Sequence, residues 1–332
     1  MLNFGQKGGF MRASSTAPLA LAAVLALSFS IGCSQFGQLQ AMRSFKAANQ
    51  AYQQNQYEKA AELYEETLSQ GPRADVEAQT YFYLGNSYDN QFRPSRKGEP
   101  DNDALLEKAV VNYQKAVDKL GTSENPQDKK LGTLSFQYLV AAYGAEKLND
   151  PAKAEPLVQR MIQLEPREVS NYVELARIYE DAGAYAEAEN TLLAAKTANP
   201  DNPTVYQYLA TYYNRQNEFD KTIDALEQRA AKEPSNPEAF FTISAYYYDN
   251  ASKNFRLKEQ EKRDQVDKGL AAVDRALGIR SDYQDALIFK GLLLRQQALL
   301  EKDPAKQTAL VNEAKELAAK ADELRKKKAA GN

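Results

Sequence analysis

The chain has no histidine, no tryptophan and one cysteine among its 332 residues, whereas it has twenty tyrosines. Without histidine, it has no Ser–His or Cys–His nucleophile, no imidazole base and none of the common His-bearing zinc sites. One cysteine also excludes an intramolecular disulfide framework. The 42 basic residues nearly balance the 45 acidic ones, and a net charge of −3 argues against a nucleic-acid-binding protein. Most familiar hydrolase and metalloprotease chemistry is therefore excluded.

The N-terminus has the pattern of an export signal. Residues 1–32 contain Lys7 and Arg12 and no acidic residue, and they include an apolar run from Leu19 to Ile31. A basic start followed by an apolar centre of roughly 7–15 residues is typical of a signal peptide. The run is shorter than the roughly 20 residues that a membrane-spanning helix needs. We therefore expect residues 1–32 to be removed, and Met11 is an alternative start.

The only cysteine follows this run, in the segment SIGCS at residues 30–34. The segment resembles a bacterial lipobox: Gly32 fits the pattern, whereas Ser30 replaces the usual aliphatic residue. The resemblance implies cleavage before Cys33, lipid attachment to Cys33 and a lipidated linker over residues 33–43. More than one acyl chain, at about 0.8 kcal/mol per buried CH₂, would anchor the protein stably. The alternative is ordinary cleavage nearby, which leaves Cys33 as a free thiol.

Five residue columns recur every 34 residues along the middle of the chain. They are Pro166, Pro200 and Pro234; Leu175, Leu209 and Ile243; Tyr172, Tyr206 and Phe240; Tyr179, Tyr213 and Tyr247; and Ala176, Ala210 and Ser244. Within one period the apolar spacing predicts two amphipathic helices joined by a short turn. In residues 170–200 we expect Gly183 to separate the helices. The expected buried stripe of the second helix is Tyr185, Ala188, Leu192 and Ala195.

This arrangement resembles the tetratricopeptide repeat (TPR). The resemblance implies an all-α fold: a right-handed α-solenoid of about seven TPR-like helix pairs over residues 44–328, some with loop insertions. The expected units are 44–72, 78–121, 133–166, 169–200, 203–234, 237–281 and 284–325. We also expect a soft point at Gly121–Gly132, and Pro156 to bend or delay the helix that contains it.

In the TPR family the first helix of each unit lines a concave groove that binds partners. Carrying the groove positions over to this chain gives candidate partner-binding residues, with packing between repeats as the alternative role for each. The candidates are Phe45, Asn49, Tyr52, Phe82, Asn86, Asn90, Arg177, Gln207, Asn214, Arg215, Phe241 and Tyr248. The carboxylate-clamp subfamily has lysines in the groove. Phe45 and Phe82 stand where one would be expected, so we do not expect a clamp ligand.

No phosphate loop, paired-cysteine spacing or Ca²⁺-loop spacing occurs in the sequence. We therefore expect no catalytic residue, no metal, no cofactor and no small-molecule substrate. The leading hypothesis is a lipid-anchored periplasmic scaffold that binds another envelope protein or peptide. Ser34 resembles the residue after the cysteine in lipoproteins sorted to the outer membrane.

Two other hypotheses remain open from the sequence. One is a cell-wall glycan-binding or carboxylate-dependent glycan-processing protein, because glycosidases need only two acids. The other is a cytosolic repeat protein without an export signal.

Overall fold

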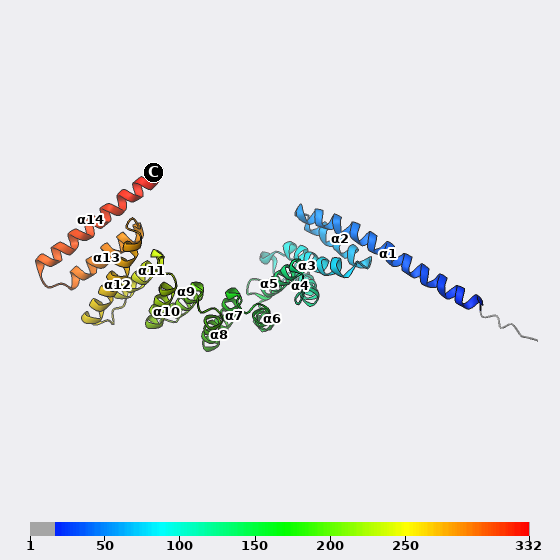
Figure 1. Ribbon diagram of the computed structural model, residues 1–332, viewed down its shortest axis with the longest axis horizontal. Coiled ribbons are helices and arrows are strands. Elements are labelled where there is room, and N and C mark those ends of the chain that lie inside the picture. Colours follow the sequence, from blue (N-terminus) through cyan, green and yellow to red (C-terminus); the bar gives the residue numbers. More distant parts are fainter. Residues whose placement is uncertain (1–16, 332) are drawn as a thin grey trace, which may run out of the picture. The chain divides into compact units, whose positions relative to one another are not determined.

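The computed structural model describes the backbone of residues 17–331 and the side chains of residues 35–331 (Figure 1). This part of the chain consists of fourteen α-helices and one short 3₁₀-helix, without a strand. The helices are α1 (Ala17–Gln53), α2 (Tyr57–Ser69), α3 (Ala74–Gln91), η1 (Pro94–Arg96), α4 (Pro100–Leu120), α5 (Pro126–Tyr143), α6 (Pro151–Leu164), α7 (Val169–Asp181), α8 (Tyr185–Ala198), α9 (Pro203–Arg215), α10 (Phe219–Lys232), α11 (Pro237–Lys253), α12 (Glu259–Ile279), α13 (Gln284–Leu300) and α14 (Pro304–Ala329). The predicted all-α fold is confirmed.

The chain packs as two compact units, Met1–Leu157 (unit 1) and Val158–Asn332 (unit 2), and their boundary lies inside α6. The predicted soft point at Gly121–Gly132 is therefore wrong. A Cβ atom on Gly132 would lie 2.6 Å from the carbonyl oxygen of Leu120. Glycine thus lets α5 approach the end of α4 with the backbones nearly in contact, which makes this junction tight.

Unit 1 begins with α1, which runs without a break through the expected linker at residues 33–43. Ala41 and Ala48 are fully buried on the side of α1 that packs against α2. A Cβ atom on Gly37 would lie 2.7 Å from the carbonyl oxygen of Gln70, so α1 already contacts the end of α2 at residue 37. Residues 37–43 are therefore part of the first helix pair, and the linker prediction is wrong for them.

The turns within helix pairs explain part of the 34-residue period. Asn149, Gly183 and Asn217 follow α5, α7 and α9, and each has a positive φ, of 54°, 74° and 60°. Glycine and asparagine tolerate this left-handed conformation, which ends many helices. After α7 the backbone N–H of Ala184 donates to the carbonyl of Tyr179 at 2.8 Å. These turns reverse the chain so that the second helix of a pair packs against the first.

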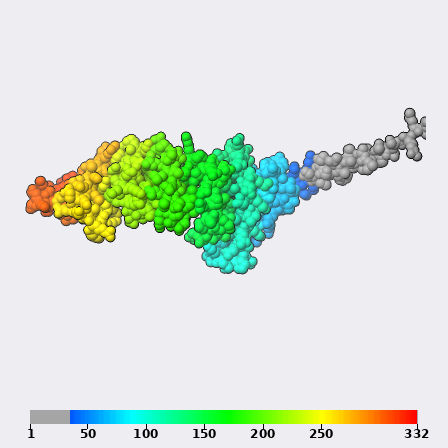
Figure 2. All heavy atoms as spheres, turned by 90° about the horizontal axis from the view of Figure 1, so that it is seen from below, coloured from blue at the N-terminus to red at the C-terminus, as the bar shows by residue number. Residues whose placement is uncertain are grey.

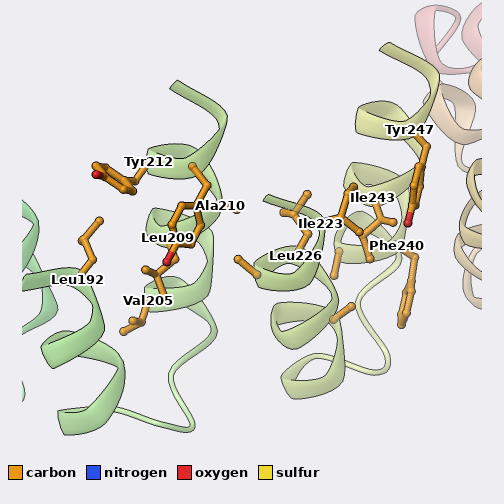
Figure 3. Packing of buried hydrophobic residues seen from close by; sticks show 14 of the residues in the cluster. Leu192, Val205, Leu209, Ala210, Tyr212, Ile223, Leu226, Phe240, Ile243 and Tyr247 are labelled. Atoms are coloured by element: carbon orange, nitrogen blue, oxygen red, sulfur yellow. The ribbon is translucent and has the colours of Figure 1, made fainter. Parts of the chain in front are cut away.

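The core of unit 2 combines residues of the recurring columns, such as Leu209 and Ile243, with apolar residues of the second helices, such as Ile223 and Leu226 (Figure 3). Leu209, Ile223, Leu226 and Ile243 lie between successive helices, and all four are buried. The proline and tyrosine columns are linked by hydrogen bonds. The Tyr172 hydroxyl donates to the Pro166 carbonyl at 3.0 Å, and that of Tyr206 donates to the Pro200 carbonyl at 2.7 Å. Successive repeats follow one another along unit 2 as bands from green to orange in Figure 2.

The insertions and Pro156 alter individual helices. In the insertion at residues 92–103, within the expected unit 78–121, residues 94–96 form η1. The Asn102 amide holds that loop by donating to the Arg93 and Arg96 carbonyls, each at 3.1 Å. The second insertion extends α11 to Lys253 and begins α12 at Glu259. Pro156 lies inside α6, which starts at Pro151, so the proline does not delay this helix. Within the described residues, no helix has both the length and the apolar character needed to cross a bilayer.

Candidate functional site

In unit 1 the predicted groove residues form a hydrogen-bonded chain across α1 and α3. The Tyr52 hydroxyl donates to Asn86 Oδ1 at 2.6 Å, and Asn90 Nδ2 donates to the same oxygen at 2.7 Å. Asn86 Nδ2 in turn donates to the Tyr113 hydroxyl on α4 at 3.2 Å. Asn49 lies apart from this chain, and its Oδ1 accepts a hydrogen bond from the Tyr64 hydroxyl at 2.7 Å. These contacts fix the positions of the amides within unit 1.

Aromatic rings link the same helices of unit 1, and we call this set the ring ladder. It consists of Phe45, Tyr52, Tyr57, Tyr64, Phe82, Tyr83, Tyr113 and Tyr138. The Tyr64 and Tyr83 rings are stacked with centroids 6.1 Å apart, and Tyr113 and Tyr138 are stacked at 5.6 Å. Such pairs contribute about 0.5–1.5 kcal/mol beyond their buried area. The ladder therefore stiffens this face of unit 1 and fills it.

Two predicted groove residues are not on the surface. Phe82 is 5% exposed, and its ring contacts those of Tyr83, Tyr113 and Tyr138. Asn86 is 2% exposed. The prediction that they face a groove is wrong, because aromatic side chains from the neighbouring helices cover them. Phe45, Asn49 and Tyr52 are half-buried, and Asn90 is exposed.

The ring ladder also changes the acidity of its hydroxyl groups. The pKa of Tyr52 is raised to about 12, chiefly by burial and to a smaller extent by the neighbouring Tyr138, Tyr57 and Tyr83 hydroxyls. Burial likewise raises the pKa of Tyr64 and of Tyr113. The hydroxyls of Tyr52, Tyr64 and Tyr113 are therefore neutral donors at ordinary pH.

In unit 2 the structure brings three predicted residues, Arg177, Gln207 and Arg215, around one hollow of about 600 Å³. The hollow lies between α7, α8 and α9, and we call it the α7–α9 hollow. Two tyrosines line it as well, Tyr185 at 52% exposure and Tyr208 at 36%. Its wall thus combines exposed aromatic rings with guanidinium groups.

Ion pairs hold both arginines of the α7–α9 hollow in place. Arg215 Nε donates to Glu180 at 3.1 Å, and Arg177 pairs with Glu174 at 2.6 Å. The Arg215 side chain is 52% exposed, whereas that of Glu180 is 14% exposed. The carboxylate is therefore covered, while part of the Arg215 guanidinium faces solvent and can donate to a partner's carbonyl or carboxylate.

A second hollow of about 770 Å³ lies between α9, α11 and α13. Asn214 is the only predicted groove residue in its lining, which also contains Asn250, Asn254 and Phe289. The Phe289 ring lies 5.1 Å from that of Phe241 and 5.5 Å from that of Tyr248, both of which are half-buried. Phe241 and Tyr248 therefore pack between α11 and α13, beside the hollow.

Neither tyrosine of the α7–α9 hollow is among the predicted partner-binding residues. Tyr185 was expected in the buried stripe of α8, but it is half exposed, whereas Ala188, Leu192 and Ala195 of that stripe are buried. The Tyr212 hydroxyl donates to the Tyr185 carbonyl at 2.7 Å, so the neighbouring repeat contacts its backbone and leaves the ring open. For Tyr208 the sequence offers one indication: this residue directly follows Gln207, which is a predicted groove residue.

The described side chains contain no cluster of metal-ligating residues. Among residues 35–331, no group of three His, Cys, Asp or Glu residues could hold a metal ion. Cys33, the predicted lipid attachment site, lies in α1, but its side chain falls outside the described residues.

Comparison with known proteins places the repeat pattern in a family. The tetratricopeptide repeat family matches residues 145–212. The crystal structure of the C-terminal part of a TPR repeat-containing protein from Cytophaga hutchinsonii covers 84% of this chain and 98% of that chain, with a TM-score of 0.52 at 13% identity. The chain is a tetratricopeptide repeat protein.

Other similarities of this TPR protein are weaker. Protein IFIT1 homolog B of Homo sapiens is 27% identical over 135 residues, which are 39% of this chain and 27% of that protein. The match thus spans about a quarter of the human protein. The crystal structure of YrrB, described as a TPR protein with an unusual peptide-binding site, covers 61% of this chain and 91% of that chain, with a TM-score of 0.38 at 19% identity.

Proposed function

We propose that this TPR protein is a lipid-anchored adaptor of the bacterial envelope, facing the periplasm from the outer membrane, that binds a peptide segment of another envelope protein. The observation that carries the binding role is the α7–α9 hollow with its two exposed tyrosines. Tyrosine and arginine are the residue types that contribute most to binding at protein interfaces. The sequence around Cys33 supports the anchor.

The geometry of the α7–α9 hollow suggests how a peptide is held. Tyr185 and Tyr208 offer ring faces for one apolar side chain of the partner. The exposed part of Arg215 offers hydrogen-bond donors to the adjacent backbone or to a carboxylate. Recognition of this kind is non-catalytic and needs no cofactor.

A photo-crosslinking pair tests the binding role in intact membranes. A photoreactive residue at Tyr208, which lines the hollow, should capture a partner, whereas the same residue at Leu193 should not. Leu193 is a matched control, because it lies on α8 with a similar exposure of 38% and does not line the hollow. With the partner identified and purified, Tyr208→Ala should weaken binding at least about tenfold, as expected for an interface hot spot. Equal capture at both positions would show that the partner does not bind at the hollow.

The anchor is tested separately from the binding role. Processing of the precursor should be blocked by globomycin, and a Cys33→Ser variant should lose both the acyl mass and the membrane association. Globomycin-insensitive processing of the wild-type chain would contradict the proposed anchor and leave the role of the hollow intact.

A further inference from the structure

The first described side chains of α1 present an apolar surface to solvent. Phe36, Leu39 and Met42 are 60%, 52% and 40% exposed. Residues three apart are neighbours along one side of a helix, so the three side chains form a continuous surface, which we call the α1 face. The α1 face begins three residues after Cys33, where the coloured surface of unit 1 starts (blue in Figure 2).

The α1 face cannot be buried by a rotation of the helix, because the other side of α1 is already packed. Ala41 and Ala48 are fully buried. Ser44 Oγ donates to Gln70 Oε1 at 3.2 Å, which fixes the register of α1 on α2. The α1 face therefore remains open in the folded unit.

The charged residues of α1 from Cys33 onward are all of one sign. Residues 33–57 contain Arg43 and Lys46 and no acidic residue, and the first acid after Cys33 is Glu58, although the whole chain has a net charge of −3. Arg43 and Lys46 are exposed. They follow Phe36 and Leu39 by seven residues, two helical turns, so they lie on the same side of α1. The surface thus changes from apolar to basic with increasing distance from Cys33.

We propose that the α1 face lies in the interface of the phospholipid bilayer to which Cys33 is anchored, with Arg43 and Lys46 against the lipid phosphates. This proposal rests on the proposed lipid anchor. Interfacial helices lie along the membrane surface and bury an apolar side by roughly 5–10 Å, and the α1 face is such an apolar side. The long basic side chains suit the phosphate level, because their stems lie along apolar surface while their charges stay in water. The acyl chains hold the protein on the membrane, and the α1 face sets the orientation of unit 1.

The single cysteine makes a sharp experiment available. When Cys33 is acylated, a second cysteine is the only free thiol and can be spin-labelled. Lipidated Leu39→Cys protein is reconstituted into phosphatidylethanolamine–phosphatidylglycerol vesicles, and the accessibility of the label to a water-soluble nickel chelate is measured. Two controls on α1 are exposed: Gln40→Cys, one residue away around the helix, and Gln50→Cys, on the same side as Leu39 but further from Cys33.

The label at residue 39 should be about tenfold less accessible to the chelate than the labels at residues 40 and 50, because the bilayer interior excludes polar solutes. Equal accessibility at all three positions, in protein that has the acyl mass, would overturn the membrane contact and leave the anchor intact. Strong spin–spin coupling between labels at residue 39 would overturn it in favour of a second copy of the chain. A chain without acyl mass would overturn the anchor, and the proposal with it.

Discussion

Units 1 and 2 use the same helix-pair repeat but differ in how the predicted groove positions are filled. In unit 1 Phe45, Tyr52 and Phe82 occupy predicted groove positions. The ring ladder packs these side chains against rings of the neighbouring helices. In unit 2 Arg177 and Gln207 occupy such positions on α7 and α9, where the α7–α9 hollow remains open, whereas Phe241 and Tyr248 on α11 pack against Phe289. The fold thus provides equivalent positions in every repeat, and the size of the side chain at each position decides whether the surface is filled or open.

This contrast suggests a division of roles between the units. A filled, hydrogen-bonded face such as the ring ladder is rigid and suits the part next to the proposed anchor. An open hollow lined by partly exposed Tyr208 and Arg215 has surface left for a partner. Three matched pairs of substitutions, one member in each unit, test how separate the units are.

The largest effect is expected from Phe82→Ala compared with Phe241→Ala. Truncation of a buried phenylalanine costs about 3–5 kcal/mol, and Phe82 is 5% exposed among three rings. Phe241 is half-buried, so its truncation should cost clearly less. Denaturant unfolding measures the total loss of stability. Hydrogen exchange should localise the effect of Phe82→Ala to unit 1, because the stability of repeat proteins is a sum of nearest-neighbour terms. An equal loss of protection in α9 and α10 would mean that the two units unfold together.

The repeat architecture was predictable because its signal is periodic. The columns of Pro200, Tyr206 and Leu209 correspond to real contacts: a buried core residue, and a hydroxyl–carbonyl bond that is also present between Tyr172 and Pro166. The sequence also predicted that Gly183 separates the two helices, and its φ there is 74°. Local patterns of this kind are visible in one sequence without knowledge of neighbouring repeats.

The surface was less predictable, because it depends on contacts between repeats. Nothing around Phe82 in the sequence indicates that Tyr113 and Tyr138, about thirty and about fifty-five residues later, will cover it. The helical spacing of Tyr185 predicted burial, whereas the next repeat contacts its carbonyl and leaves the ring exposed. The boundary inside α6 also has no local signal, since Pro156 is accommodated within the helix.

An intermediate effect is expected from Gly132→Ala compared with Gly278→Ala. In unit 1 the added Cβ atom would meet the Leu120 carbonyl oxygen at 2.6 Å, so α4 and α5 must move apart, at a cost of about 1–3 kcal/mol. In unit 2 a Cβ atom on Gly278, near the end of α12, has no heavy atom within 4 Å among those described. Alanine there should stabilise the helix by up to about 0.5 kcal/mol. Thermal unfolding measures both changes, and a neutral Gly132→Ala would show that the α4–α5 junction is looser than its geometry implies.

The smallest effect is expected from Tyr52→Phe compared with Tyr247→Phe, and it depends on pH. Loss of the bond from the Tyr52 hydroxyl to Asn86 should cost about 1 kcal/mol near neutral pH. The pKa of Tyr52 is raised to about 12 from an ordinary value of 10, chiefly by burial, so the folded state favours the neutral hydroxyl. That stabilisation is fully present below pH 10 and is lost as the pH rises towards 12. Tyr52→Phe should therefore flatten the alkaline fall in the stability of unit 1.

Burial also raises the pKa of Tyr247 to about 12, but Tyr247 lies in unit 2. Both variants should remove one late-titrating group from the phenolate absorbance curve, and hydrogen exchange at high pH should show that only Tyr52→Phe changes the protection of α1 and α3. A change in α1 and α3 caused by Tyr247→Phe would show that the units share one cooperative transition.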